Sequence, residues 1–399
     1  MTTEKTISRR AALGSLGVAA AGLAGLAAGR ARASEAPPSP NAQLGATRSV
    51  ITNPARDFTP GAIPTAYPDP DIITIDPEFA RLRVNFALIQ RIFTGGTFLE
   101  GPAWNAQGRY LIWSDVPGDK QYRYLDEDGH VSVFRTPSNN ANGNIFDFQG
   151  RLVTCEHRGR RLVRQELDGS RTVVAEYWQG KHLNSPNDVC VHPDGSYWFT
   201  DPPSGNNLYQ GIPDAPGGLR PQNDKVNNRL GYDPGMGGQK GELPGHIYRV
   251  DATGRVDKVI DQDEFGGPGN GLCFSPDYKK LYVISRGSLW AFDVAGDGKS
   301  LRGKGTAFAD MMVDGVRCGT DGVRADIYGN LWASSNAGAN LGYHGVTIWN
   351  PQGKLIGRIR LPEGTANVTF GGARRNRLFM TASQSVYALY VETQGAAPS

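Results

Sequence analysis

The chain has 399 residues, of which 39% are hydrophobic and 20% are charged, and its formal net charge is +3. This length can bury one large core or two smaller ones, and no Lys/Arg block interleaved with aromatic residues suggests a nucleic-acid partner. The 52 Gly and 26 Pro residues are more than a helical protein usually carries and indicate a chain with many turns.

Residues 1–33 have the composition of an export signal. The arginine pair in Ser8–Arg10 precedes an Ala/Gly/Leu stretch, Ala11–Gly29, and an A-x-A sequence follows at Ala31–Ala33. This order predicts a twin-arginine leader, and therefore a periplasmic or secreted protein with no membrane attachment after cleavage. A transmembrane anchor is the alternative, although the stretch is short and only mildly hydrophobic.

Residues 34–85 read as a Pro/Ala-rich arm that ends in a short helix. The helix is predicted where Asp76 can cap and Pro77 can take the first helical position. Residues 86–93, FALIQRIF, then predict a strand, and residues 394–399 are a short C-terminal tail.

One pattern recurs six times between residues 86 and 393. A residue with a side-chain oxygen precedes an apolar strand, and a turn joins that strand to a second one, as in SPNDVCVHPDGSYWFTD from Ser185 to Asp201. The interval is roughly 45 residues, except where a Gly/Pro/Asn-rich insert at about 202–245 lengthens it. The leading residues are Glu100, Asn144, Asn187, Asn270, Asp321 and Asn367.

Between the leading residues lie apolar runs split by a glycine turn, which predict outer β-hairpins. These runs are 122–135, 162–177, 246–262 and 346–361. An inner and an outer hairpin give four antiparallel strands per repeat, so the sequence predicts an all-β, six-bladed β-propeller over residues 86–393. We expect the N-terminal strand 86–93 to pair with the C-terminal strand 386–393 and close the ring. A β-sandwich is the alternative, and the sixfold recurrence argues against it.

The four cysteines form no C-x-x-C pair and have no metal-ligand spacing. An oxidising compartment would permit a disulfide. Cys190 and Cys273, however, occupy the same repeat position inside apolar strands, which favours buried free thiols.

The innermost strands of a propeller lie along its axis, so the six leading residues should converge at one end of the channel. A single Asn or Asp before a strand usually caps a turn, but six oxygen donors in one column are hard to ascribe to separate turns. Carboxylate and amide oxygens suit Ca²⁺, and the lack of His and Cys in the column argues against zinc and copper.

Over about residues 86–393 the chain resembles the SMP-30/gluconolactonase/luciferin-regenerating family of six-bladed, calcium-dependent lactonases. The motifs are EGPAW from Glu100, SPND and FTD within Ser185–Asp201, NGL and FSPD within Asn270–Asp277, and DG at Asp321. These motifs are most similar to those of bacterial gluconolactonases. Some SMP-30-like members place a substrate-contacting arginine where this chain has Ser185.

The resemblance implies a metal site made of Glu100, Asn187, Asn270 and Asp321, with calcium or another divalent cation bound. Asn144 and Asn367 are then expected to line the pocket or to contact the ligands. We treat Ser185, His157 and His182 as candidates for substrate contacts near the pocket mouth.

These residues predict hydrolysis of a small-molecule sugar lactone, with D-glucono-1,5-lactone as the first candidate. The cation would act as a Lewis acid on the lactone carbonyl, and Asp321 is the candidate base for the attacking water. Activation of the water by the cation is the alternative, because a carboxylate beside a dication is a weak base.

Two other functions fit the same pattern. The metal site would also support phosphotriesterase-like hydrolysis, or hydrolysis of another ester. A propeller can instead be a non-enzymatic interaction scaffold, although a scaffold needs no column of oxygen ligands. The sequence contains no G-x-S-x-G motif, and it does not predict the oligomeric state.

Overall fold

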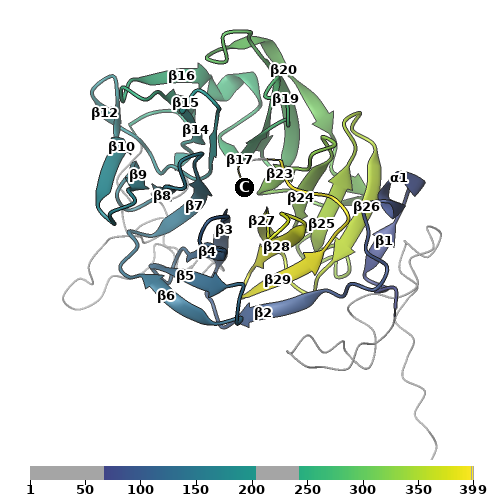
Figure 1. Ribbon diagram of the computed structural model, residues 1–399. Helices are drawn as coiled ribbons and strands as arrows, with labels where there is room; N and C mark the ends of the chain where they lie inside the picture. Colours follow the sequence, from purple (N-terminus) through teal and green to yellow (C-terminus); the bar gives the residue numbers. More distant parts are fainter. Residues whose placement is uncertain (1–66, 204–241, 397, 399) are drawn as a thin grey trace, which may run out of the picture. The chain divides into compact units, whose positions relative to one another are not determined.

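The computed structural model describes residues 67–203, 242–396 and 398. The predicted leader, most of the N-terminal arm and most of the insert lie outside these residues. In the described ranges six antiparallel sheets of four or five strands are arranged as the blades of a β-propeller around a central axis (Figure 1). The predicted fold class is therefore confirmed. No helix within these ranges is long and apolar enough to cross a membrane.

Each of the first three blades runs from the axis outwards in sequence order. Blade 1 consists of β3 (Leu99–Asn105), β4 (Tyr110–Asp115), β5 (Lys120–Leu125) and β6 (Val131–Arg135). Blade 2 consists of β7 (Ala141–Phe146), β8 (Leu152–Glu156), β9 (Arg161–Gln165) and β10 (Arg171–Ala175). Blade 3 consists of β13 (Val189–Val191), β14 (Tyr197–Thr200), β15 (Ile247–Val250) and β16 (Val256–Ile260).

Blades 4 and 5 follow the same order. Blade 4 consists of β17 (Gly269–Phe274), β18 (Lys280–Ser285), β19 (Ser288–Val294) and β20 (Leu301–Ala309). Blade 5 contains β23 (Val323–Ala325), β24 (Leu331–Ser335), β25 (Gly345–Trp349) and β26 (Leu355–Arg360). The connections between blades carry the 3₁₀ helix η4 (Gln262–Glu264) and two short ribbons, β11 (Tyr177–Trp178) with β12 (Lys181–His182), and β21 (Met312–Val313) with β22 (Val316–Arg317).

Blade 6 joins the two ends of the propeller. It contains β27 (Thr365–Gly371), β28 (Arg377–Ala382), β29 (Ser385–Tyr390) and, as the outer strand, β2 (Gln90–Thr94). Gln90 pairs with Ala388 and Thr94 with Ser385, so the predicted closure is confirmed. The N-terminal strand starts later than predicted, because the backbone turns from Val84 to Ala87.

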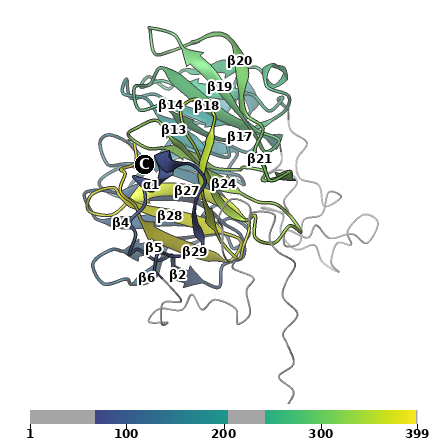
Figure 2. The same cartoon turned by 90° about the vertical axis from the view of Figure 1, so that its right-hand side faces the viewer.

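The end of the N-terminal arm adds structure to blade 5. Asp76 caps helix α1 (Pro77–Ala80) by accepting the Glu78 N–H at 3.0 Å, as the sequence predicts. The preceding segment forms β1 (Ile72–Thr74), which pairs with β26 as a fifth strand and was not predicted. β1 and α1 lie at the outer rim beside β26 and face the viewer in Figure 2.

Large aromatic side chains fill the space within and between blades. Trp113, Trp198 and Trp332 are fully buried in the second strands of blades 1, 3 and 5. Trp104 stacks on Phe379 of blade 6, with ring centroids 5.7 Å apart. Trp104 and Trp113 therefore belong to the core of the propeller. All four cysteines are buried and free, also as predicted.

Candidate active site

The innermost strands of neighbouring blades are hydrogen-bonded to one another near the axis. The Gly143 N–H donates to Asn187 O, the Gly271 N–H to Asp321 O and the Gly322 N–H to Ala366 O, each at 2.8 Å. In each contact the carbonyl comes from the leading residue of one blade, and the donor is the residue that directly follows the leading residue of the neighbouring blade. The leading residues are Glu100, Asn142, Asn187, Asn270, Asp321 and Ala366.

Two backbone features bring the leading residues together. The ladders of the inner strands shift register at the leading position in blades 1, 2, 4 and 6, as a β-bulge does when it re-aims a side chain. The next residue is glycine in four blades. A Cβ at Gly101 would lie 2.0 Å from Asn142 O, and one at Gly271 would lie 2.3 Å from Asp321 O. Only glycine allows this approach.

Glu100 is a buried carboxyl in a cluster of acidic groups. Its Oε2 accepts the Gly101 N–H at 3.0 Å and Asn367 Nδ2 at 3.2 Å. Burial raises the pKa of the Glu100 carboxyl well above its ordinary value, and the carboxylates of Asp321 and Asp188 raise it further. Burial and like charges thus disfavour the ionised form of Glu100, and a bound cation would offset this repulsion and favour the carboxylate.

Asn187 is delivered to the axis by a loop that Asp201 holds. The Asp201 carboxylate accepts the N–H groups of Asn184 at 2.8 Å and Ser185 at 2.9 Å, and the Asn187 N–H donates to Thr200 O at 2.9 Å. Burial raises the pKa of Asp201 to about 7, although these two hydrogen bonds lower it.

The hydroxyl of Ser185 is committed to the backbone of the same region, where it donates to Pro202 O. Asn184 Nδ2 donates to Leu243 O at 2.9 Å. Pro202 and Leu243, at the two described ends of the insert, therefore both contact the loop that carries Asn187.

Asn270 and Asp321 complete the predicted set of ligands. Oδ1 of Asn270 is buried and has no hydrogen-bond partner among the described residues. The Asp321 backbone N–H donates to Ser334 Oγ at 2.9 Å, which fixes the strand start that carries its carboxylate.

The leading position differs from the predicted one in two blades: in blade 6 it is Ala366 rather than Asn367, and in blade 2 it lies two residues before Asn144. The structure places Asn142 at the leading position. Asn144 lies fully buried between blades 1 and 2. Its Nδ2 donates to Gly101 O at 2.8 Å, and its Oδ1 accepts from Gln121 Nε2 at 2.7 Å and Thr154 Oγ1 at 2.8 Å. Its amide is thus used in holding the two blades together.

The two histidines singled out in the sequence lie in different places. His157 is buried, and its Nε2 lies 3.1 Å from Nδ2 of Asn142, so it supports a residue of the column. His182 lies in the ribbon β11–β12, with its Nδ1 4.0 Å from Glu176 Oε1 and its ring 4.1 Å from that of Tyr177. The structure does not bring His182 to the column.

The donor set fits a hard divalent cation. Glu100 and Asp321 offer carboxylates, and Asn187 and Asn270 offer amide oxygens. Among residues 67–203, 242–396 and 398, Oδ1 of Asn270 is buried and has no hydrogen-bond partner. Within the described ranges no group of three or more His, Cys, Asp or Glu side chains could hold a metal. A site of two carboxylates and two amides agrees with this, because it contains no thiolate or imidazole and too few acids to form such a group.

Sequence reasoning missed three residues near the column: Asn142, Asp188 and Asp201. Asn142 could have been found, because it precedes Gly143 in the same X-Gly dipeptide as Glu100, Asn270 and Asp321. Asp188 and Asp201 stand in the SPND and FTD motifs, but their roles depend on contacts that sequence patterns do not show.

Comparison with known proteins agrees with this architecture. The SMP-30/Gluconolactonase/LRE-like region matches residues 98–384. A gluconolactonase of Zymomonas mobilis is 26% identical over 321 residues, which cover 74% of this chain and 79% of that protein. The pentonolactonase XacC of Haloferax volcanii is 25% identical over 291 residues, 71% of this chain and 81% of that protein.

A solved structure of a gluconolactonase from Xanthomonas campestris superposes with a TM-score of 0.66 and 31% identity, covering 84% of this chain and 98% of that one. The resemblance seen in the sequence is thereby confirmed: the chain belongs to the SMP-30/gluconolactonase/LRE-like family.

Proposed function

We propose that this protein hydrolyses a sugar lactone with the help of a divalent cation, for which calcium is the candidate. The observation that carries the proposal is the convergence of Glu100 and Asp321 with Asn270, whose buried Oδ1 has no hydrogen-bond partner in the part of the chain that the structure describes. The relatives named gluconolactonase and pentonolactonase support a lactone as the substrate class. D-Glucono-1,5-lactone is the first substrate to test.

The chain's own residues have separate tasks in this proposal. Glu100, Asn187, Asn270 and Asp321 would hold the cation. Bound there, the cation would supply Lewis-acid stabilisation of the charge that develops on the lactone carbonyl oxygen.

The neighbouring groups keep the ligands in place and serve the substrate. Asn367 and the Gly101 N–H fix one oxygen of Glu100 and leave its other oxygen for the axis. Asp321 would accept the proton of the attacking water. Asn142, supported by His157, would present its amide to a substrate hydroxyl.

The test is lactone hydrolysis by the purified protein, followed as acid release in calcium-containing and in chelator-treated buffer. We expect chelation, Glu100→Gln and Asp321→Asn each to lower kcat/KM by at least about 100-fold. Asp293→Asn is the matched control. The side chain of Asp293 is 61% exposed, and it lies on β19, the third strand of blade 4, whereas Asn270 lies on the innermost strand β17. Full activity in chelator would contradict the metal role.

The same assay separates the remaining functions when its substrates are varied. Turnover of a phosphotriester with no turnover of gluconolactone or a pentonolactone would favour the phosphotriesterase reading. Binding of calcium with no hydrolysis of any lactone or ester would favour a scaffold.

We further propose export by the twin-arginine route, supported by the arginine pair Arg9–Arg10 and the A-x-A sequence that ends at Ala33. N-terminal sequencing of the protein from a periplasmic or culture fraction should begin after Ala33. Replacement of both arginines by lysine should leave the uncleaved chain in the cytoplasm.

A further inference from the structure

A buried ion pair links blades 3 and 5 through residues that lie close in sequence to two candidate ligands. Asp188 follows Asn187 directly, and Arg324 stands three residues after Asp321 on the inner strand of blade 5. Nη1 of Arg324 lies 3.3 Å from Asp188 Oδ2, and its Nη2 lies 3.5 Å from Asp188 Oδ1. Asp188 is 1% exposed and Arg324 is 4% exposed. The two charges are therefore removed from water together.

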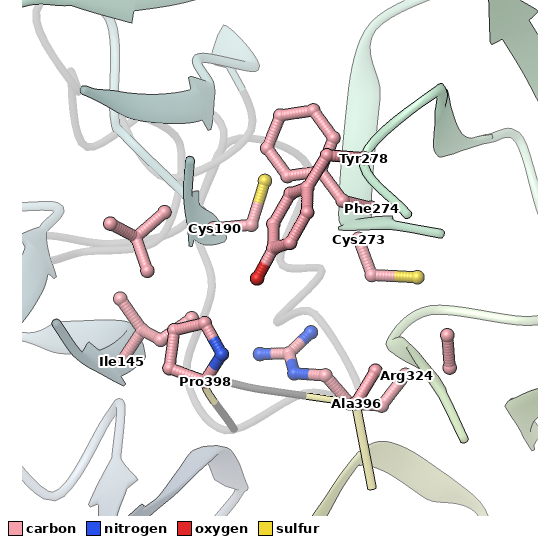
Figure 3. Close-up of a pocket in the computed structure, with 10 residues that line it drawn as sticks. Ile145, Cys190, Cys273, Phe274, Tyr278, Arg324, Ala396 and Pro398 are labelled. Atoms are coloured by element: carbon pink, nitrogen blue, oxygen red, sulfur yellow. The ribbon is translucent and has the colours of Figure 1, made fainter. Parts of the chain in front are cut away.

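The surroundings of Arg324 make it depend on this partner. Its guanidinium points into a cavity of ≈ 30 Å³ whose other lining residues carry no charge, among them Cys190, Cys273 and Tyr278 (Figure 3). Nη1 also donates to Val323 O at 2.8 Å and to Leu272 O at 3.4 Å, whereas Nε has no partner among the described residues. An isolated cation in such a place would be costly to bury.

Arg324 thus joins three inner strands. Asp188 belongs to the start of blade 3, Leu272 lies on β17 of blade 4, and Arg324 itself lies on β23 of blade 5. These are the strands that bring Asn187, Asn270 and Asp321 to the axis. A guanidinium can hold them together because its donors are fixed in one plane.

Asp188 also takes part in the charge of the site. Its Oδ1 accepts the Val189 N–H at 2.9 Å, and a Cβ at Gly143 would lie 2.8 Å from the same oxygen. Its negative charge repels that of the Glu100 carboxylate, as the charge of Asp321 does. Arg324 neutralises the charge of Asp188. Glu100 and Asp321 are then left as the two carboxylates that would balance a single dication.

We propose that Arg324 is a positioning residue that neutralises Asp188 and holds Asn187, Asn270 and Asp321 in register for one divalent cation. This inference rests on the proposed metal-dependent function. It makes two separate claims, one about the metal-free fold and one about the affinity for calcium.

The first claim is tested by thermal unfolding in chelator. Asp188→Asn and Arg324→Met each leave one buried charge without its partner, so each should lower the midpoint by several degrees. The double variant should lose less than the sum of the two single losses. Strict additivity would overturn the claim that the pair acts as a unit.

The second claim is tested by calorimetric titration with calcium. Asp188→Asn exposes the cation of Arg324 to the site and should weaken calcium binding by at least about tenfold. Asp188→Asn combined with Arg324→Met restores neutrality and should bind within about threefold of the parent. Arg324→Lys keeps the charge and should also bind within about threefold. If the double variant or Arg324→Lys binds as weakly as Asp188→Asn, charge balance is excluded.

The matched control is the buried pair Asp71–Arg360, whose Oδ1 and Nε lie 3.1 Å apart in blade 5 and its attached strand. Asp71→Asn with Arg360→Met should show coupled stability and unchanged calcium affinity. If the parent itself binds no calcium, the proposed function and the charge-balance claim both fall. If the parent binds calcium and the variants do not differ, only the inference about Arg324 falls.

Discussion

At the scale of single residues, the column separates side chains that face the axis from side chains that hold blades together. Asn142 and Asn144 illustrate this, because they stand two residues apart on one strand. Asn142 has one described side-chain contact, with His157. Asn144 makes hydrogen bonds from both ends of its amide to five other residues. Sequence alone suggested the second of them.

The two asparagines should therefore respond differently to truncation. Asn144→Ala should lower the free energy of unfolding by about 2–4 kcal/mol, because it leaves several buried donors and acceptors without partners. Asn142→Ala should leave stability nearly unchanged and lower kcat/KM for the lactone. Urea unfolding and steady-state kinetics on both variants check this. A stable Asn144→Ala protein with impaired catalysis would place Asn144 in the site instead.

The raised pKa of Asp201 should make the free energy of unfolding depend on pH. Its pKa rises from 3.8 to about 7 on folding, through burial. Between these values the folded state holds a proton that the unfolded chain has lost, so this group's contribution to stability is full below about 4. It is lost as the pH rises through about 7, at up to about 1.4 kcal/mol per pH unit.

Asp201→Asn removes this titration. The free energy of unfolding should then vary less between pH 4 and 7 than in the parent, and it should be lower by about 1–3 kcal/mol, because an amide accepts only one of the two N–H groups well. Urea unfolding at several pH values measures both effects. An unchanged pH dependence in the variant would show that Asp201 does not titrate in this window.

At the scale of elements, the inner strands of blades 1, 2, 4 and 6 begin with a bulge, and close backbone contacts join the starts of inner strands in neighbouring blades. Glycine at positions 101, 143, 271 and 322 permits the contact in four blades. Blades 3 and 6 instead carry Asp188 and Asn367 there, and each of these side chains accepts the next backbone N–H. The same strand feature thus serves both inter-blade packing and the arrangement of the candidate ligands.

Gly271→Ala tests this coupling. A Cβ at residue 271 meets the backbone at Asp321 O, which cannot move without shifting blade 5, so we expect a loss of about 1–3 kcal/mol in stability together with weaker calcium binding. Gly296→Ala is the control, since a Cβ there has only an ordinary contact 3.5 Å from Arg302 Nη2. Thermal unfolding and calcium titration report the two effects. Equal behaviour of the two variants would contradict the role of the contact.

At the scale of the whole molecule, the ring is closed by a strand from the N-terminal side of the domain. β2 pairs with β29, and Phe93 on β2 packs across the seam, with its ring centroid 5.2 Å from that of Trp113 and 5.0 Å from that of Tyr122. When the ring closes, the outer strand of blade 6 is therefore stabilised by aromatic contacts with blade 1. All six leading residues depend on this closure, because they meet only in a complete ring.

Phe93→Ala should lower the free energy of unfolding by about 2–4 kcal/mol through the loss of aromatic contacts at the seam. Phe86→Ala is the matched control, because Phe86 is 78% exposed and precedes β2. It should change stability by less than about 0.5 kcal/mol. Chemical denaturation checks both values. A small loss for Phe93→Ala would mean that the seam contributes little to the stability of the ring.

Much of the fold could be predicted because its signals are local. Alternation of apolar residues, glycine turns and the recurring leader residues are each read within a few positions of the chain, and they identified the blades and the closing strands. The capped helix after Asp76 was predicted for the same reason. Strand β1 was not, because its stability comes from the exposed edge of β26, which lies far away in the sequence.

Local sequence patterns were enough to predict the six repeats, the all-β class and the candidate oxygen donors Glu100, Asn187, Asn270 and Asp321. The tertiary structure decided which asparagine of blade 2 reaches the axis, because a bulge shifts the register there, although the Asn142–Gly143 dipeptide carries a local signal for it. It also decided that Asp188 meets Arg324, 136 residues away. Such a pair forms only when the ring brings the inner strands of different blades together, and burial then makes each charge depend on the other.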